Sequence, residues 1–256
     1  MEKTKIEVNV EEFPQELSYL FENAEIYDSS SSSSAKVYYT TQGYYIKVSA
    51  KGKLQEEAAL TKFFAERKLG VEVVHFLSAD KDYLVTKSAK GEDCLVYLDD
   101  PKRLCKVLAE TMRKLHSQPI EGAPVSIRMK WFSDTAAGKT ECEYEEYVLM
   151  DRFPIHSKEE AWQVIQENKH RLKADTLIHG DFCLPNVMLE DWKFSTFIDL
   201  PLAGVGDKHV DIYWALWSLK YNLKTDKYTD LFLDLYGREN FDHDMLRVIG
   251  AFEVWG

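Results

Sequence analysis

The spacing of apolar residues changes near residue 90, and this change limits the possible folds more than any other feature. Before it, short runs of β-branched and aromatic residues surround one helical stretch, and after it long amphipathic patterns dominate. Strands repeat every 2 residues and helices every ~3.6, so the two patterns are not interchangeable. The sequence therefore predicts a strand-rich lobe over residues 1–90 and a mainly helical lobe over residues 91–256.

The first lobe is expected to be an antiparallel sheet with one helix packed on it. A Gln42-Gly43 turn separates two of the strands, and the helix is expected over Glu56–Lys68, ending before Gly70. The expected strands, in chain order, are Glu25–Asp28, Lys36–Thr41, Tyr44–Ser49, Val71–Leu77 and Tyr83–Ser88.

In the second lobe, a long amphipathic helix is expected to begin at Pro101. A capping box at Ser157 predicts another helix that runs toward His170. The segment Thr176–Leu200 instead favours loops and short strands, and helices resume at about Lys208. The fold class predicted is α+β, with an antiparallel sheet lobe and a helical lobe.

Composition excludes several classes of protein. The net charge of −11 and the lack of a basic stripe argue against nucleic-acid binding and favour a cationic ligand. No apolar run approaches the roughly 20 residues of a membrane span, and the start lacks a signal peptide, so we expect a cytoplasmic protein. The scattered cysteines, with no CxxC pair, indicate reduced thiols rather than zinc or disulfides. These are Cys94, Cys105, Cys142 and Cys183.

The segment His179–Asn186 contains the groups that phosphoryl transfer requires. It places Asp181 and Asn186 five residues apart across a tight loop, and Asp199 follows at the end of an apolar strand. Phosphoryl transfer needs a carboxylate that orients the attacking hydroxyl and hard oxygen ligands for Mg²⁺. Asp181 suits the first task, and Asn186 and Asp199 suit the second.

Two further residues of the first lobe complete this set. Lys47 lies within an expected strand, and Glu57 lies on the following helix. Glu56 is the alternative partner for Lys47. A strand lysine that contacts nucleotide phosphates is commonly paired with a helical glutamate.

These motifs resemble those of the aminoglycoside phosphotransferase family, particularly its 3′-phosphotransferases, which share the protein-kinase fold. The resemblance extends over nearly the whole length of the chain. The segments that carry it are Ala35–Tyr38, Tyr45–Lys47, the helix with Glu57, Val74–Phe76, Leu115–His116, His179–Asn186, Phe197–Leu200 and Ala203–Ile212.

The resemblance implies a role for each matching residue. Asp181 would be the catalytic base, Asn186 and Asp199 the Mg²⁺ ligands, and Lys47 with Glu57 the phosphate clamp. Tyr45 would lie against the adenine, and the backbone around Ser88 and Ala89 would form the adenine-reading hinge. ATP would be the phosphoryl donor, with GTP as an alternative.

The six serines Ser29–Ser34 have two interpretations. By composition they are a flexible linker. The resemblance favours a loop that covers the nucleotide phosphates, with Ser33 and Ser34 as the contact residues.

The substrate implied by the resemblance is a cationic amino sugar, and acidic residues are the expected contacts. The run Glu141–Glu146 is either a solvated surface or part of an anionic substrate wall. The residues proposed to contact substrate are Glu145, Glu146, Asp151 and Glu253, with Asp134 as a further candidate. The protein could be a monomer or a homodimer.

Other polar and aromatic residues of this lobe are expected to have structural roles. Asp211 should tie down the catalytic loop, and His179 should brace it from within. His116 is expected to be a hydrogen-bonded core histidine, with Trp214 and Trp217 packed in the core.

The chain departs from the family pattern near the substrate. Pro201 and Leu202 stand where 3′-phosphotransferases usually have glycine and arginine, and Lys220–Asn222 replace expected acidic contacts. Because proline fixes φ and lacks an N–H group, altered geometry is expected after Asp199. A kinase of another small alcohol, such as choline, a macrolide or a metabolite, therefore remains an alternative. A degenerate nucleotide-binding relative is another.

Overall fold

The computed structural model describes residues 4–30, 35–139 and 143–255. Contacts divide the chain into two compact units. The first comprises the residues up to Lys90 together with Thr196–Pro201, and the second comprises Gly91–Ser195 and the residues from Leu202 onward. No helix in the described ranges is long and apolar enough to cross a membrane.

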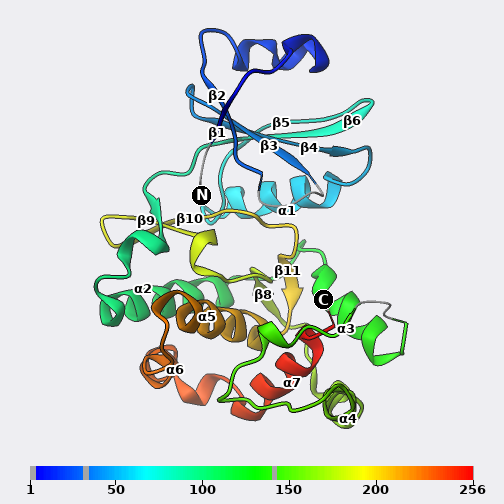
Figure 1. Cartoon of the computed structure of the whole chain (residues 1–256), viewed down its shortest axis with the longest axis vertical. Coiled ribbons are helices and arrows are strands. Elements are labelled where there is room, and N and C mark those ends of the chain that lie inside the picture. Colours follow the sequence, from blue (N-terminus) through cyan, green and yellow to red (C-terminus); the bar gives the residue numbers. More distant parts are fainter. Residues whose placement is uncertain (1–3, 31–34, 140–142, 256) are drawn as a thin grey trace. The chain divides into compact units, whose positions relative to one another are not determined.

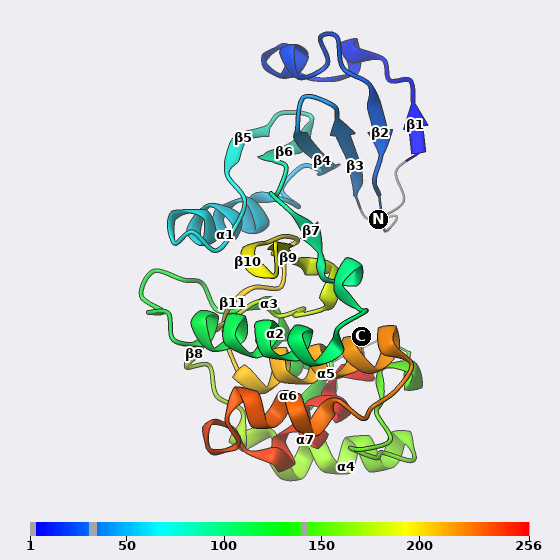
Figure 2. The ribbon, with the colours of Figure 1, turned by 90° about the vertical axis from the view of Figure 1, so that its left-hand side faces the viewer.

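The first unit is built on a six-stranded antiparallel sheet in the order β1-β2-β3-β4-β6-β5. Figure 2 shows β1 to β4 side by side. The strands are β1 (Thr4–Ile6), β2 (Ile26–Asp28), β3 (Lys36–Thr40), β4 (Tyr44–Ala50), β5 (Val73–Ser78) and β6 (Lys81–Lys87). In β4, Lys47 lies opposite Val37 of β3 and Leu84 of β6.

Each face of this sheet has its own cover (Figure 1). On one face, Ile46 packs with Leu17 and Leu20 of the 3₁₀ helix η2 (Gln15–Leu20). On the other, Leu84 packs with Ala58 of helix α1 (Gln55–Glu66). Since side chains alternate along a strand, Lys47 projects from β4 on the face that α1 covers.

The second unit contains two small sheets. A three-stranded sheet has the order β10-β9-β7, and a two-stranded sheet pairs β11 with β8. The strands are β7 (Glu92–Asp93), β8 (Thr176–Ile178), β9 (Val187–Glu190), β10 (Lys193–Phe197) and β11 (Gly204–Gly206). The end of β10 belongs to the first unit, where the Phe197 N–H donates to the Leu69 carbonyl at 2.7 Å.

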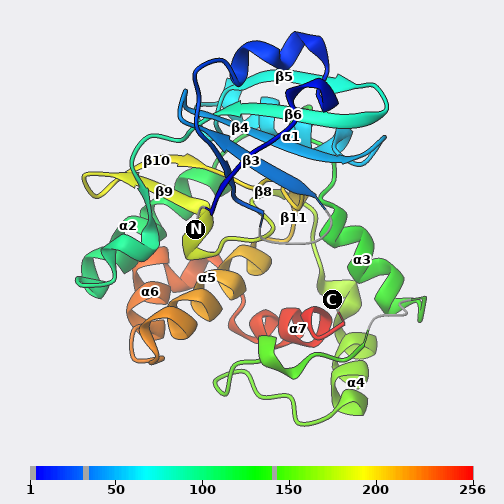
Figure 3. The same ribbon diagram turned by 45° about the horizontal axis from the view of Figure 1, so that its top comes forward.

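Helices form most of the second unit. They are α2 (Pro101–His116), α3 (Ile127–Ala136), α4 (Lys158–Asn168), α5 (Lys208–Leu223), α6 (Thr229–Tyr236) and α7 (His243–Glu253). Helix α7 packs against both α4 and α5 (Figure 3). Helix α4 begins at the Ser157 cap, whose hydroxyl accepts the Glu160 N–H at 3.1 Å.

The predicted elements are confirmed with small differences at their ends. Every strand expected before residue 90 is present, and the helix expected over Glu56–Lys68 is α1. The helices expected at Pro101, Ser157 and Lys208 are α2, α4 and α5. Strands β1, β7 and β11, the 3₁₀ helices before Phe21 and helix α3 were not predicted.

Candidate active site

Asp211 anchors the loop that follows β8. Its Oδ2 accepts the His179 N–H and its Oδ1 accepts the Gly180 N–H, both at 2.8 Å. The His116 ring bonds to the same carboxylate at 3.1 Å and to the Tyr236 hydroxyl at 2.8 Å. The structural roles predicted for Asp211 and His116 are confirmed.

Gly180 occupies a position that only glycine can fill. Its φ is +80°, in the region that residues with a Cβ disfavour. A Cβ built there would lie 2.0 Å from the Leu202 carbonyl oxygen. This contact explains why the residue between His179 and Asp181 is glycine rather than the arginine of protein kinases.

Asp181 and Asn186 are joined across the loop. The Asn186 side-chain amide donates to the Asp181 carboxylate at 2.9 Å and to the Asp181 carbonyl at 3.0 Å. Because the amide nitrogen is used in this way, the Asn186 side-chain oxygen is the atom suited to a metal ion. The five-residue spacing therefore brings the proposed base and one proposed ligand into contact.

The helix that carries Asp211 begins at a buried cap. Asp207 accepts the His209 N–H at 3.0 Å and the Lys173 N–H at 2.9 Å, and it contacts the His209 ring at 2.5 Å. Burial alone would raise the pKa of this carboxyl, but the His209 contacts and the Lys173 N–H outweigh burial and lower it. Folding therefore favours the ionised form.

Replacing Asp207 by asparagine should reduce the free energy of unfolding by about 1.5–3 kcal/mol near neutral pH, because a charged hydrogen-bond acceptor is lost. Since the folded pKa is lowered, this stabilisation is present above the unfolded pKa of ~3.9 and is lost as the pH falls through the folded value. Urea unfolding of both proteins at about pH 7 and about pH 3 measures it. An equal difference at both pH values would contradict this account.

In the first unit, Lys47 lies between two carboxylates. Its Nζ is 2.8 Å from Glu57 and 3.3 Å from Asp199. Burial alone would lower the pKa of Lys47, but Asp199 and Glu57 outweigh burial and raise it. Lys47 is therefore a fixed cation. The structure pairs it with Glu57, which is buried, whereas the competitor Glu56 is exposed.

Asp199 adopts an unusual backbone conformation, with φ at +57°. A non-glycine residue in this region costs about 1–2 kcal/mol, so its surroundings must impose it. The carboxylate is partly exposed, and one of its oxygens contacts Lys47. Mg²⁺ commonly takes only one or two protein carboxylates and completes its shell with water and phosphate oxygens. The chemistry of Asp199 and Asn186 fits this ion.

The residues predicted to contact adenine lie on the sheet and just after it. Tyr45 is two residues from Lys47 on the same face of β4, and its ring is 5.1 Å from that of Tyr39. The Ser88 N–H already donates to the Gly43 carbonyl at 2.8 Å. The Ser88 N–H is therefore occupied within the sheet, and the predicted hinge contacts fall to the Ser88 carbonyl and the Ala89 backbone. Ser33 and Ser34 lie outside the described residues.

The acidic residues predicted to bind substrate differ in exposure. Glu145 and Glu146 are exposed, and so is Asp151, whose carboxylate lies 2.9 Å from Lys220 Nζ. Glu253 instead is only 2% exposed and binds Arg128 and the Trp214 indole N–H. Burial raises the pKa of Glu253 against the opposing effects of these partners. The structure thus places Glu253 inside the protein rather than on a substrate-facing surface.

Arg128 is a residue that sequence reasoning missed. It lies on α3, is 5% exposed, and its Nε donates to the Gly180 carbonyl at 2.6 Å. The one available signal was a helical spacing of the buried positions Arg128, Phe132 and Thr135. Two of the three are polar, so the stripe lacks the apolar character of a typical helix face.

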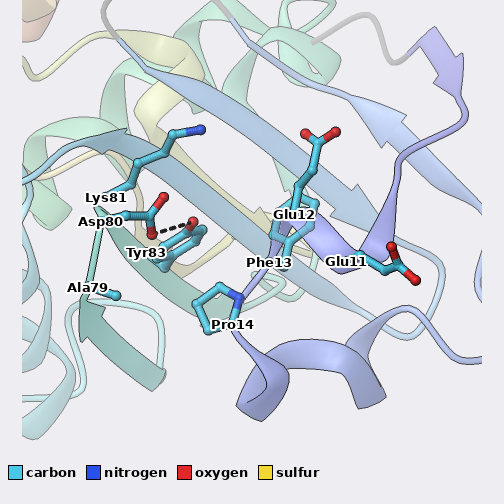
Figure 4. Close-up of a pocket in the computed structure, with 8 residues that line it drawn as sticks. All are labelled: Glu11, Glu12, Phe13, Pro14, Ala79, Asp80, Lys81 and Tyr83. Carbon is cyan, nitrogen blue, oxygen red and sulfur yellow. Dashed lines mark hydrogen bonds between the residues drawn. The ribbon is translucent and has the colours of Figure 1, made fainter.

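A hollow of about 480 Å³ lies elsewhere in the first unit (Figure 4). Its apolar wall includes Phe13, Pro14 and Tyr83, and the Tyr83 hydroxyl donates to Asp80 at 3.3 Å. None of the predicted site residues lines it. This hollow therefore does not coincide with any of the residues predicted from the sequence to form the site.

Comparisons with known proteins identify the family of this chain. A model of the phosphotransferase enzyme family matches residues 28–249. The chain belongs to this family. The resemblance predicted from the sequence is confirmed, and so is the predicted fold class, which the solved structures below share.

Two relatives show how similar the sequences are. The chain is 40% identical to a probable aminoglycoside 3′-phosphotransferase of Lactococcus lactis over 98% of each protein. It is 32% identical over 169 residues to an aminoglycoside 3′-phosphotransferase of Niallia circulans, covering 65% of this chain and 64% of the relative.

Two solved structures share the fold at low sequence identity. An aminoglycoside 3′-phosphotransferase of type VIII superposes with a TM-score of 0.65 at 19% identity, covering 99% of this chain and 94% of its own. An aminoglycoside phosphotransferase from Streptomyces rimosus gives a TM-score of 0.64 at 18% identity, and the match covers 89% of this chain and 92% of the Streptomyces protein.

Proposed function

We propose that this protein transfers the γ-phosphoryl group of ATP to a hydroxyl of an aminoglycoside, with the 3′-hydroxyl as the acceptor. A new bond forms between the acceptor oxygen and the γ-phosphorus while the bond from that phosphorus to the β–γ bridging oxygen breaks. ADP leaves, and the hydroxyl proton passes to a carboxylate. Family membership and the 40% identical relative support this assignment.

The single observation that carries the proposal is the arrangement of Asp181. Its loop is anchored by Asp211, and its carboxylate is oriented by the Asn186 amide at 2.9 Å. A carboxylate fixed in this way can accept a proton from an acceptor hydroxyl, which is the role of the base in phosphoryl transfer.

The remaining groups act on the phosphates. Lys47, paired with Glu57, would contact them, and Asn186 and Asp199 would each supply an oxygen ligand for Mg²⁺. When bound, Mg²⁺ neutralises charge that develops on the phosphate oxygens. Tyr45 stacks on the nucleobase, and the backbone at Ser88 and Ala89 reads its edge. ATP is the proposed donor, with GTP as the alternative.

The exposed acids are the proposed contacts for substrate ammonium groups. Glu145 and Glu146 are exposed, and opposing charge improves both capture and orientation of a cation. Asp151 is also proposed, although an ammonium group must compete there with Lys220 at 2.9 Å.

Steady-state turnover with Mg-ATP tests the proposal directly. A panel of acceptors should include a 4,6-linked aminoglycoside, its 3′-deoxy analogue, streptomycin, a macrolide and choline. Turnover of roughly 1–100 s⁻¹ is expected with the first and none with the 3′-deoxy analogue. Turnover of the macrolide or choline alone would establish the alternative acceptor. Nucleotide binding without transfer to any acceptor would indicate a degenerate relative.

An exposed aromatic group favours less cationic acceptors as the second candidate. The Trp217 and Tyr221 rings of α5 stack with centroids 5.0 Å apart at 8°. Tyr221 is 57% exposed and Tyr147 is 68% exposed. The ring centroids of Tyr147 and Trp217 are 6.4 Å apart. The exposed Tyr221 and Tyr147 rings offer aromatic contact area, although Lys224 Nζ lies 4.2 Å from the Tyr221 ring centroid, and Lys220 partly neutralises the adjacent Asp151.

Replacing Tyr221 by alanine should raise the KM for the acceptor by roughly 3- to 10-fold, because the outer ring of the stack is lost. The kcat should not change, since the ring takes no part in the transfer. Tyr221→Phe keeps the ring and should retain the wild-type KM. An unchanged KM in Tyr221→Ala would show that the acceptor does not contact this surface.

A further inference from the structure

Arg128 makes two contacts that join distant segments of the second unit. Its Nε donates to the Gly180 carbonyl at 2.6 Å, and its Nη1 donates to the Glu253 carboxylate. Gly180 belongs to the catalytic loop, Glu253 ends α7, and Arg128 lies in the first turn of α3. One guanidinium therefore connects two helices to the loop.

The guanidinium is held in a fixed position. Arg128 is 5% exposed and Glu253 is 2% exposed, so each charge depends on the other for compensation. The Trp214 indole N–H donates to the other Glu253 oxygen at 3.0 Å, and the guanidinium lies 5.1 Å from the Trp214 ring centroid. Arginine suits this place because its planar fork supplies several donors at once.

These contacts immobilise the peptide group that carries Asp181. Arg128 binds the carbonyl of that peptide at Gly180, and the Asp181 N–H lies 3.3 Å from His179 Nδ1. Asp211 binds the preceding N–H groups at 2.8 Å. Asp211 thus fixes the start of the loop, whereas Arg128 fixes the peptide next to the proposed base.

We propose that Arg128, braced by Glu253, is a positioning residue that orients the Gly180–Asp181 peptide for phosphoryl transfer. The proposal rests on the function assigned to Asp181 above. It also gives Glu253 a role that does not involve substrate. A displacement of a reacting group by about 1 Å can slow an enzyme by ~100-fold.

Replacing Arg128 by methionine should lower kcat by about 10- to 100-fold and leave the KM for ATP within about twofold. Arg128→Lys should recover part of the loss, since one ammonium group can reach Gly180 or Glu253 but not span both as the fork does. Arg238→Met is the matched control, because it removes an exposed arginine paired with Asp230 and Asp234. It should retain wild-type kinetics.

The double variant Arg128→Met/Glu253→Gln separates positioning from a purely structural role. Arg128→Met alone leaves the Glu253 carboxylate buried and unpaired, which should lower the melting temperature. The second change removes that charge, so the melting temperature should recover while kcat stays low. Recovery of kcat together with stability would overturn the proposal. If Arg128→Met alone fails to fold, the kcat of the double variant still tests the proposal.

A spectroscopic readout is independent of turnover. In ¹⁵N-aspartate-labelled protein, the Asp181 amide resonance should shift in the Arg128 variants and not in Arg238→Met. An unmoved resonance or wild-type kcat in Arg128→Met would refute the positioning role. A wild type that transfers phosphate to no acceptor would instead refute the proposed function, and the resonance would still report on Arg128.

Discussion

Asp181→Asn is expected to lower kcat by about 10²- to 10⁴-fold, because it removes the carboxylate that we propose accepts the proton of the acceptor hydroxyl. Asparagine has the same shape, and its side-chain oxygen can still accept the Asn186 amide that lies 2.9 Å away. The loop should therefore keep its structure. Initial-rate measurements with saturating Mg-ATP and acceptor give the ratio of the two kcat values.

A control with the same chemical change shows whether the loss is specific to this carboxylate. Asp191→Asn removes one negative charge from the exposed turn between β9 and β10, where φ is +51°, a conformation that asparagine tolerates. It should keep wild-type kcat. Nucleotide affinity should be unchanged in both variants. If Asp181→Asn turns over within about twofold of wild type, Asp181 is not the base.

Gly180→Ala should destabilise the protein by on the order of 3–5 kcal/mol, from backbone strain together with steric overlap. The φ of +80° disfavours any Cβ, and that atom would meet the Leu202 carbonyl at 2.0 Å. Relief of the overlap requires the loop to move away from Leu202, so activity should fall as well. Urea unfolding and kcat measure the two effects.

Gly138→Ala separates strain from overlap. Its φ is +70°, but the nearest atom to a new Cβ is on Trp162 at 3.7 Å, an ordinary contact. This variant should lose only about 1–2 kcal/mol and keep its activity. Equal losses at the two glycines would show that the Leu202 carbonyl does not restrict residue 180.

Local sequence patterns were sufficient to predict most of the fold. The strands that became β2 to β6 have β-branched and aromatic residues bounded by turns, and α2 has an apolar stripe preceded by a proline. Helix α3 was missed because its buried side chains include Arg128 and Thr135. A helix whose inner face is polar gives no amphipathic signal.

For the site, as for the fold, local contacts could be predicted from the sequence and long-range contacts could not. The contact between Asp181 and Asn186 in the proposed catalytic loop was predictable because the two residues lie close together in sequence. Glu253 was predicted to contact substrate because the resembling family uses acidic residues near its C-terminus to hold ammonium groups, but burial excludes it from such a surface here. Its partner Arg128 lies 125 residues away, and no local pattern reveals such a pair.

The sequence by itself determined the two kinds of lobe, the family resemblance and the residues suited to phosphoryl transfer, since these depend on periodicity and local spacing. Only the tertiary structure decided which carboxylates are exposed and what fixes the loop. Asp211 and Arg128 reach it from α5 and α3, and the Leu202 carbonyl admits only glycine at position 180. Burial and ion pairing arise between segments that are distant in sequence, so they exist only once the chain has folded.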